Sequence, residues 1–140
     1  MTDGLNKIAL LASADLTAAE VALRGIPNDD PGGTFSAVVA GLLREGKASL
    51  AEIVANGERV GFTVYQIETF AGNHRELVSV ATVCEGTRNL KFEIEHSLEA
   101  IARANGCRSI RMHTARHGLV KLALNNGWHT AEIVLRKSIR

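Results

Sequence analysis

Residues 48–84, ASLAEIVANGERVGFTVYQIETFAGNHRELVSVATVC, decide the fold of this chain. The stretch is rich in β-branched residues and is interrupted twice by short turn sequences, Asn56-Gly57-Glu58 and Ala71-Gly72-Asn73. It therefore predicts three strands, Ala48–Ala55, Arg59–Phe70 and Glu76–Cys84. Because turns this short join neighbouring antiparallel strands, the three segments are expected to form a meander within one sheet.

Two amphipathic helices are predicted on either side of the meander. The first begins at the N-cap residue Thr34, ends before Gly46 and carries an apolar stripe of Phe35, Val38, Val39, Leu42 and Leu43. The second spans Asn89–Asn105, and its apolar face consists of Leu90, Ile94, Leu98 and Ile101. Since each stripe covers only one side, both helices are expected to pack against the sheet.

Shorter segments complete the order. Apolar runs predict three further strands, at Lys7–Ala12, Arg108–Thr114 and Thr130–Ile139. Helix-ending glycines help to predict two short helices, at Thr17–Arg24 and His117–Asn126. The resulting order, β-α-α-β-β-β-α-β-α-β, indicates an α/β (α+β) fold with a mixed, mostly antiparallel, twisted sheet flanked by helices. Length and the absence of repeats predict a single domain, 1–140. Trp128 is expected to anchor the core.

The composition is that of a folded protein in water. Of the 140 residues, 46% are apolar and 22% are charged. No run approaches the about 18 apolar residues of a membrane span, and the start MTDGLNK lacks the features of a signal peptide. Cys84 and Cys107 have no CxxC spacing, which predicts reduced thiols. The expected location is the cytoplasm or an assembled particle such as a virion, with no membrane partner.

The formal net charge of +1 hides an asymmetry between the two halves of the chain. Residues 1–70 hold nine acidic and five basic side chains, whereas residues 71–140 hold six acidic and eleven basic ones. Such a split is typical of an anion site, an interaction surface or solvated helix faces. Because aromatic residues are only 4% and the basic residues are dispersed among acids, a nucleic-acid partner is not expected.

Three local sequences, in this order of elements, resemble the GCN5-related N-acetyltransferase (GNAT) family. They are the turn Asn56–Gly61 (NGERVG), the junction Val83–Leu90 (VCEGTRNL) and the helix end Leu122–Trp128 (LALNNGW). In that family the strands before and after the long helix separate, and acyl-CoA lies in the gap with its pyrophosphate at the helix N-terminus. The resemblance implies that Gly86, Thr87, Arg88 and Asn89 are the cofactor-binding residues.

The chain departs from the family pattern at three places. Glu85 lies beside Gly86, where a carboxylate would repel the phosphates, and Arg88 stands where the loop of the family has another small residue. Ala123 occupies the position of the family's general-acid tyrosine, and His117 replaces a frequent asparagine. The chain after Gly127 is long enough for one strand, where the family usually has two. These departures predict no catalytic residues of the family type.

Other candidate chemistry remains open at a few side chains. His113 and His117 bridge a strand end and a helix start, a spacing that does not predict a metal site. Cys84 precedes a helix and is either a stabilised thiolate or a buried structural thiol. Glu68 and Glu76 are either general bases for an amine acceptor or surface carboxylates.

Two functions follow from the sequence. The favoured one is a non-catalytic binding or assembly module without a cofactor, acting through a protein partner or a homo-oligomer. Compact GNAT-like proteins with a sequence such as Arg116-His117-Gly118 resemble some encoded among tailed-phage virion genes. The alternative is an acyl-CoA-dependent N-acetyltransferase that uses acetyl-CoA, a divergent pyrophosphate loop and a glutamate or histidine base.

Overall fold

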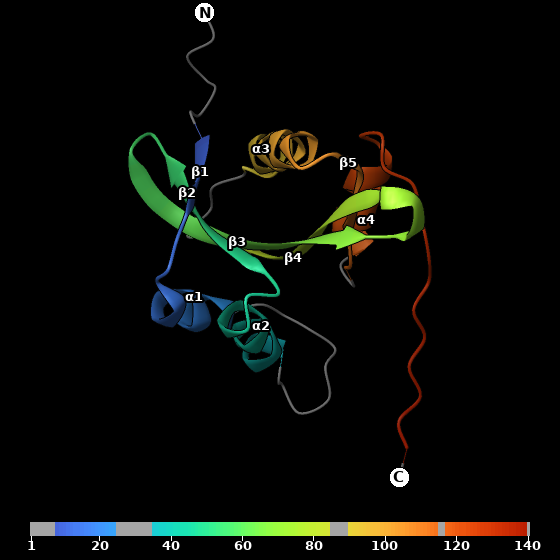
Figure 1. Cartoon of the computed structure of the whole chain (residues 1–140), viewed down its shortest axis with the longest axis horizontal. Helices are drawn as coiled ribbons and strands as arrows, with labels where there is room; N and C mark the ends of the chain where they lie inside the picture. The colour runs from blue at the N-terminus through green and yellow to red at the C-terminus, as the bar shows by residue number, and fades with distance from the viewer. Residues whose placement is uncertain (1–7, 25–34, 85–89, 115–116, 140) are drawn as a thin grey trace, which may run out of the picture.

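A single five-stranded sheet organises the chain (Figure 1), whose computed structural model describes residues 8–24, 35–84, 90–114 and 117–139. The strand order follows the sequence, from β1 to β5. The strands are β1 (Ile8–Ala12), β2 (Ser49–Ala55), β3 (Glu58–Thr69), β4 (Arg75–Cys84) and β5 (Cys107–Met112). The first four pair antiparallel, and β5 runs parallel to β4. This mixed, mostly antiparallel sheet confirms the predicted fold class.

Helices cover both faces of the sheet. In Figure 1, α1 (Leu16–Leu23) and α2 (Phe35–Arg44) lie on one face, and α3 (Lys91–Ala104) lies on the other. The short α4 (His117–Leu124) follows β5, and a 3-10 turn, η1 (Ala71–Asn73), joins β3 to β4. Asp15 caps α1 by accepting a hydrogen bond from the backbone N–H of Ala18 at 3.2 Å.

The sheet separates two apolar clusters, one on each face. The cluster beneath α3 consists of Ile53, Ala55, Val60, Leu77, Leu90, Ile94, Leu98 and Ala102. The cluster beneath α1 and α2 consists of Ala19, Leu23, Val39, Leu50, Phe62, Val64 and Ala81. Burying each large side chain contributes about 1.5–3 kcal/mol, so the two clusters hold the helices to the sheet.

The pairing of the strands has three irregularities. In the β4–β5 pairing, the register shifts between Arg75 and Glu76, and Arg108 is skipped. The β2–β3 register shifts between Ile53 and Val54, and Val80 of β4 is skipped in the pairing with β3, where Val64 faces Ala81 and Tyr65 faces Ser79. Such bulges increase the local twist and redirect the strand.

Gly61 lies where β3 and β4 approach closely. It pairs with Cys84, and a Cβ atom at this position would overlap the backbone carbonyl of Val83. The glycine that closes the NGERVG turn is therefore required by the backbone of the neighbouring strand.

The C-terminal segment differs from the sequence prediction. Residues 130–139 were expected to form a strand, but they are extended and belong to no strand of the sheet. Ile133, Leu135 and Ile139 are 81%, 90% and 87% exposed. Within the described residues, no strand of the sheet pairs with this segment. A strand forms only when another strand pairs with it.

Trp128 is half-buried and is therefore not the core anchor that the sequence suggested. Its indole Nε1 donates a hydrogen bond to Glu95 Oε1 at 2.7 Å, which ties the end of α4 to α3.

Among the residues that the structure describes, no helix is both long and apolar enough to cross a membrane.

The close approach at Gly61 generates a stability prediction. Gly61→Ala should lower the free energy of unfolding by about 1–3 kcal/mol, because the backbone of Val83 cannot move aside without disrupting the β3–β4 pairing. Gly41→Ala in α2 is the control, since the space around Gly41 is open and alanine favours a helix by about 1 kcal/mol. Urea unfolding measures both. Equal effects of the two substitutions would contradict the explanation.

Candidate functional site: the gap between β4 and β5

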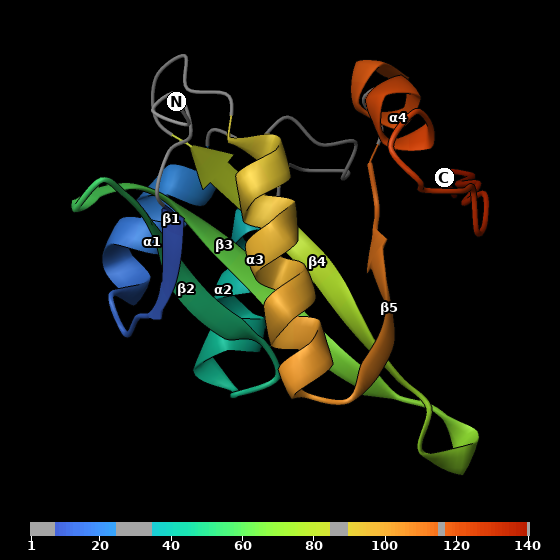
Figure 2. The same cartoon turned by 90° about the horizontal axis from the view of Figure 1, so that it is seen from above.

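The strands β4 and β5 pair from Arg75 and Cys107 as far as Ser79 and Met112 and then separate. Their pairing ends at Ser79 and Met112, yet β4 continues through Val80 to Cys84. The bulge at Val80 falls at this point, so β4 bends where β5 leaves it. Figure 2 shows β4 and β5 diverging towards the end of the sheet where α4 lies. The gap that the sequence resemblance implied is therefore present.

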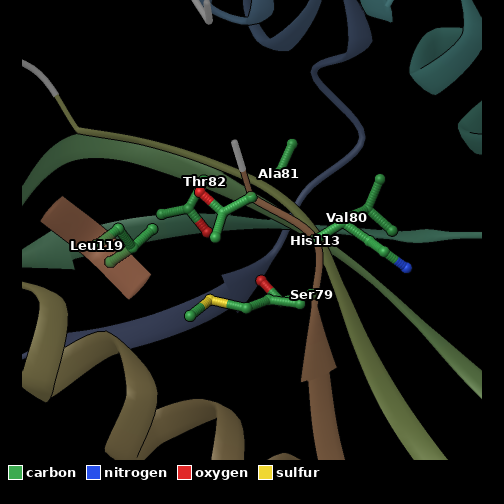
Figure 3. Close-up of a pocket in the computed structure, with 8 residues that line it drawn as sticks. Ser79, Val80, Ala81, Thr82, His113 and Leu119 are labelled. Atoms are coloured by element: carbon green, nitrogen blue, oxygen red, sulfur yellow. The ribbon is translucent and has the colours of Figure 1, made fainter. Parts of the chain in front are cut away.

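A hollow of ≈ 160 Å³ lies at this gap (Figure 3). Its lining is made of small, aliphatic and hydroxyl side chains with a single imidazole: Ser79, Val80, Ala81, Thr82, Met112, His113, Thr114 and Leu119. In Figure 3, Val80 and His113 lie on the side opposite Thr82 and Leu119. The Thr82 hydroxyl forms a hydrogen bond with the hydroxyl of buried Thr63, with 2.9 Å between the two oxygens. Among these eight lining residues, His113 alone has a titratable side chain.

The predicted cofactor residues, Gly86, Thr87, Arg88 and Asn89, lie outside the described residues, as does Glu85. Leu90, the N-cap of α3, is buried and makes no side-chain hydrogen bond to the helix. An apolar N-cap leaves the first N–H groups of α3 without a side-chain acceptor from this position.

Glu68 and Glu76 face each other across β3 and β4, and Arg111 of β5 binds both. Its two terminal guanidinium nitrogens donate to Glu68 Oε2 and Glu76 Oε1, each at 2.9 Å. Ser109 Oγ donates to the second oxygen of Glu76 at 2.8 Å. The guanidinium separates two carboxylates that would otherwise repel each other.

This network decides between the two interpretations of the carboxylates. Glu76 and Arg111 are mostly shielded from water, with 18% and 22% of their side chains exposed. A carboxylate whose oxygens already accept charge-assisted hydrogen bonds is a poor free base for an incoming amine. The structural role therefore explains Glu68 and Glu76, and Arg111, which sequence reasoning did not connect to them, completes the cluster.

Neither cysteine has the character of a nucleophile. Burial raises the pKa of the Cys84 thiol, which packs against the cluster beneath α3. Burial also raises the pKa of Cys107; Arg75 opposes this rise, and Glu76 adds to it. Since the thiolate is the reactive form, these shifts favour the structural interpretation of Cys84 over the stabilised thiolate.

The end of α4 carries the remaining sequence candidates. Ala123, at the position of the family's tyrosine, presents only a methyl group, and its carbonyl oxygen accepts from the backbone N–H of Asn126 and Trp128 at 2.8 Å and 3.2 Å. His117 is exposed at the start of α4. Within the described ranges, no group of three or more histidine, cysteine or acidic side chains is placed to hold a metal ion.

Comparison with known proteins gives the class of this fold. Neither a family model nor a curated protein matches the chain in sequence. Among solved structures, an acetyltransferase of Trypanosoma brucei superposes with a TM-score of 0.64 at 18% identity, over 96% of this chain and 100% of that one.

Two further structures show how widely the fold is used. The enzyme AAC(6')-Iy, solved with the bisubstrate analogue CoA-S-monomethyl-acetylneamine, has a TM-score of 0.63 at 14% identity, over 98% of this chain and 99% of its own. A transcriptional regulator of Bacillus halodurans C-125 has the same TM-score and identity, over 96% and 100%. The chain therefore has the GNAT acetyltransferase fold. At these identities the similarity extends to the fold alone.

The Arg111 network generates a second stability prediction. Arg111→Met should lower the free energy of unfolding by about 1–3 kcal/mol, because Glu68 and Glu76 then face each other without their shared cation. Arg108→Met, on the exposed side of the same strand, is the control and should change it by less than about 0.5 kcal/mol.

A double variant tests the cause of that loss. Adding Glu68→Gln to Arg111→Met removes the repulsion between the carboxylates and should recover part of the stability. Denaturant unfolding of the three proteins gives the comparison. No recovery would show that Arg111 acts only through packing.

The raised pKa of Cys84 predicts its reactivity. At pH 7 its alkylation by iodoacetamide should be slower than that of free cysteine, and the rate should still rise with pH above the ordinary thiol value of 9.0. Mass spectrometry of the modified peptide separates Cys84 from Cys107. Rapid alkylation of Cys84 at neutral pH would instead indicate the thiolate interpretation.

Proposed function

We propose that this chain is a binding or assembly module that retains the GNAT fold without acetyl transfer and without an acyl-CoA cofactor. The observation that carries the proposal is the state of the acid–base candidates that the sequence offered. Glu68 and Glu76 are engaged by Arg111, and Ala123 has no proton to donate. Of the lining residues, His113 alone has a titratable side chain.

The size of the hollow supports the same proposal. Its ≈ 160 Å³ is below the roughly 300–1,000 Å³ of ordinary ligand pockets. In this proposal the gap is only the place where the β4–β5 pairing ends. The protein partner of the module binds elsewhere on the surface. We propose that the module acts either in an assembled particle such as a virion or in the cytoplasm.

One observation favours a second candidate, an acyl-CoA-dependent N-acetyltransferase. The gap exists in the place where the family binds its cofactor, and one structure of the same fold contains a CoA-derived analogue. In this alternative, backbone around Gly86 with Arg88 holds the pyrophosphate, and His113 accepts the proton of the amine. The amine nitrogen bonds to the thioester carbonyl carbon, the C–S bond breaks, and CoA leaves as the thiolate.

Acetyl-CoA consumption tests the proposal. The purified chain, incubated with acetyl-CoA and a panel of amines (a lysine peptide, a polyamine and an aminoglycoside), should release CoA no faster than buffer, measured by chromatography. His113→Ala should give the same rate. A saturable release that His113→Ala lowers about 100-fold or more would overturn the proposal in favour of the transferase.

Thermal unfolding tests the absence of the cofactor. Millimolar acetyl-CoA should leave the Tm of the wild-type chain unchanged, because a ligand raises Tm only by binding the native state. A rise in Tm that Gly86→Glu abolishes would show that the cofactor site works. Gly118→Glu is the matched control, since it adds the same charge at the start of α4, in open space.

A further inference from the structure

We propose that the hydrogen bond between Trp128 and Glu95 is a latch that holds α4 to α3 and keeps the gap between β4 and β5 narrow. When this bond opens, α4 moves away from α3 and the gap widens. The proposal goes beyond the function proposed above, because it concerns what sets the width of the gap and holds whether or not the gap takes a cofactor.

The latch connects the two sides of the gap. Along the chain, β4 leads to α3 and β5 leads to α4. Backbone pairing joins the two strands only as far as Ser79 and Met112. In Figure 2, α4 lies beyond the end of β5, whereas α3 lies over the sheet on the β4 side. The bond from Trp128 Nε1 to Glu95 Oε1 therefore ties the helix that follows one strand to the helix that follows the other, where the strands themselves have parted.

Apolar packing holds α4 less firmly than it holds the longer helix α3 or the equally short α1. Ala19 and Leu23 of α1 are buried, as are Ile94 and Leu98 of α3, whereas no residue of α4 is buried. Leu124, the last residue of α4, is 49% exposed. Segments with few buried apolar contacts open at a low free-energy cost. The position of α4 therefore depends strongly on its polar contact with α3.

The geometry of the bond suits this role. Its length of 2.7 Å is at the short end of the range for N–H···O bonds, as expected for a carboxylate acceptor. Trp128 and Glu95 are both half-buried, so water competes for the two groups less than at an open surface. Asn126, in the same turn, instead donates to the carbonyl oxygen of Leu122 within α4. Of these two side chains at the end of α4, Trp128 is the one that reaches α3.

α4 also forms part of the wall of the hollow. Leu119 of this helix lines the hollow together with residues of β4 and β5, and in Figure 3 it lies on the side opposite Val80 and His113. With the latch closed the hollow measures ≈ 160 Å³. Movement of α4 carries Leu119 outward and enlarges the hollow, so the larger space is a minor conformation of the free chain.

Fluorescence tests whether the bond holds Trp128, which is the sole tryptophan in the sequence. Glu95→Ala removes the acceptor and should shift the emission to longer wavelength and increase quenching by acrylamide. Glu95→Gln keeps an oxygen acceptor and should give values between those of Glu95→Ala and the wild type. Glu99→Ala is the matched control, since it removes a carboxylate one turn further along α3 that pairs with Arg103, and it should leave the emission unchanged.

Hydroxyl-radical footprinting with mass spectrometry tests whether the bond also controls the gap. In Glu95→Ala, oxidation of Met112 and Leu119, which line the hollow, should rise several-fold. Oxidation of Phe62, buried beneath α1 and α2, should not change.

Three results would overturn the proposal. Unchanged emission in Glu95→Ala would mean that the bond does not hold Trp128. A shifted emission without increased oxidation of Met112 would mean that the bond does not control the gap. An equal rise at Phe62 would mean that it only stabilises the fold as a whole. Neither measurement involves acetyl-CoA, so failure here is distinct from failure of the proposed function.

Discussion

The separation of β4 from β5 after the Ser79–Met112 pair is the constraint on which the rest of the structure depends. The Val80 bulge turns β4 at this point, and the strand continues to Cys84 and into the segment that leads to α3. Because β5 ends at Met112, its pairing with β4 is short. The hollow at the gap is a consequence of that divergence.

The charged groups near the divergence serve the sheet. Arg111 holds two carboxylates from β3 and β4 at 2.9 Å each, so the three strands are tied together just before β5 departs. Together with the Ser109 hydroxyl, Arg111 occupies both oxygens of Glu76, and it occupies one oxygen of Glu68. A fold associated with acyl transfer can therefore keep its shape while its polar side chains stabilise the scaffold, and the resemblance in topology says little about chemistry at 12–18% identity.

Most of the fold could be predicted from the sequence, because β-branched runs, short turns and helical stripes specify local structure. The prediction failed for residues 130–139: an apolar run favours a strand, but a strand also needs a neighbour, which local sequence does not specify. The Arg111 cluster could not be foreseen, since the pairing of Glu68, Glu76 and Arg111 depends on a register set by bulges. Gly86 to Asn89 lie outside the described residues and stay a prediction.

The central claim is that the gap between β4 and β5 is retained without a cofactor. The most direct measurement is an NMR titration of the ¹⁵N-labelled chain with CoA, following the backbone amides of Val80, Ala81, Thr82 and His113, which border the hollow. The account predicts that these amide signals stay in place up to millimolar CoA. Saturable shifts concentrated at these four residues would contradict it and establish the gap as a cofactor site.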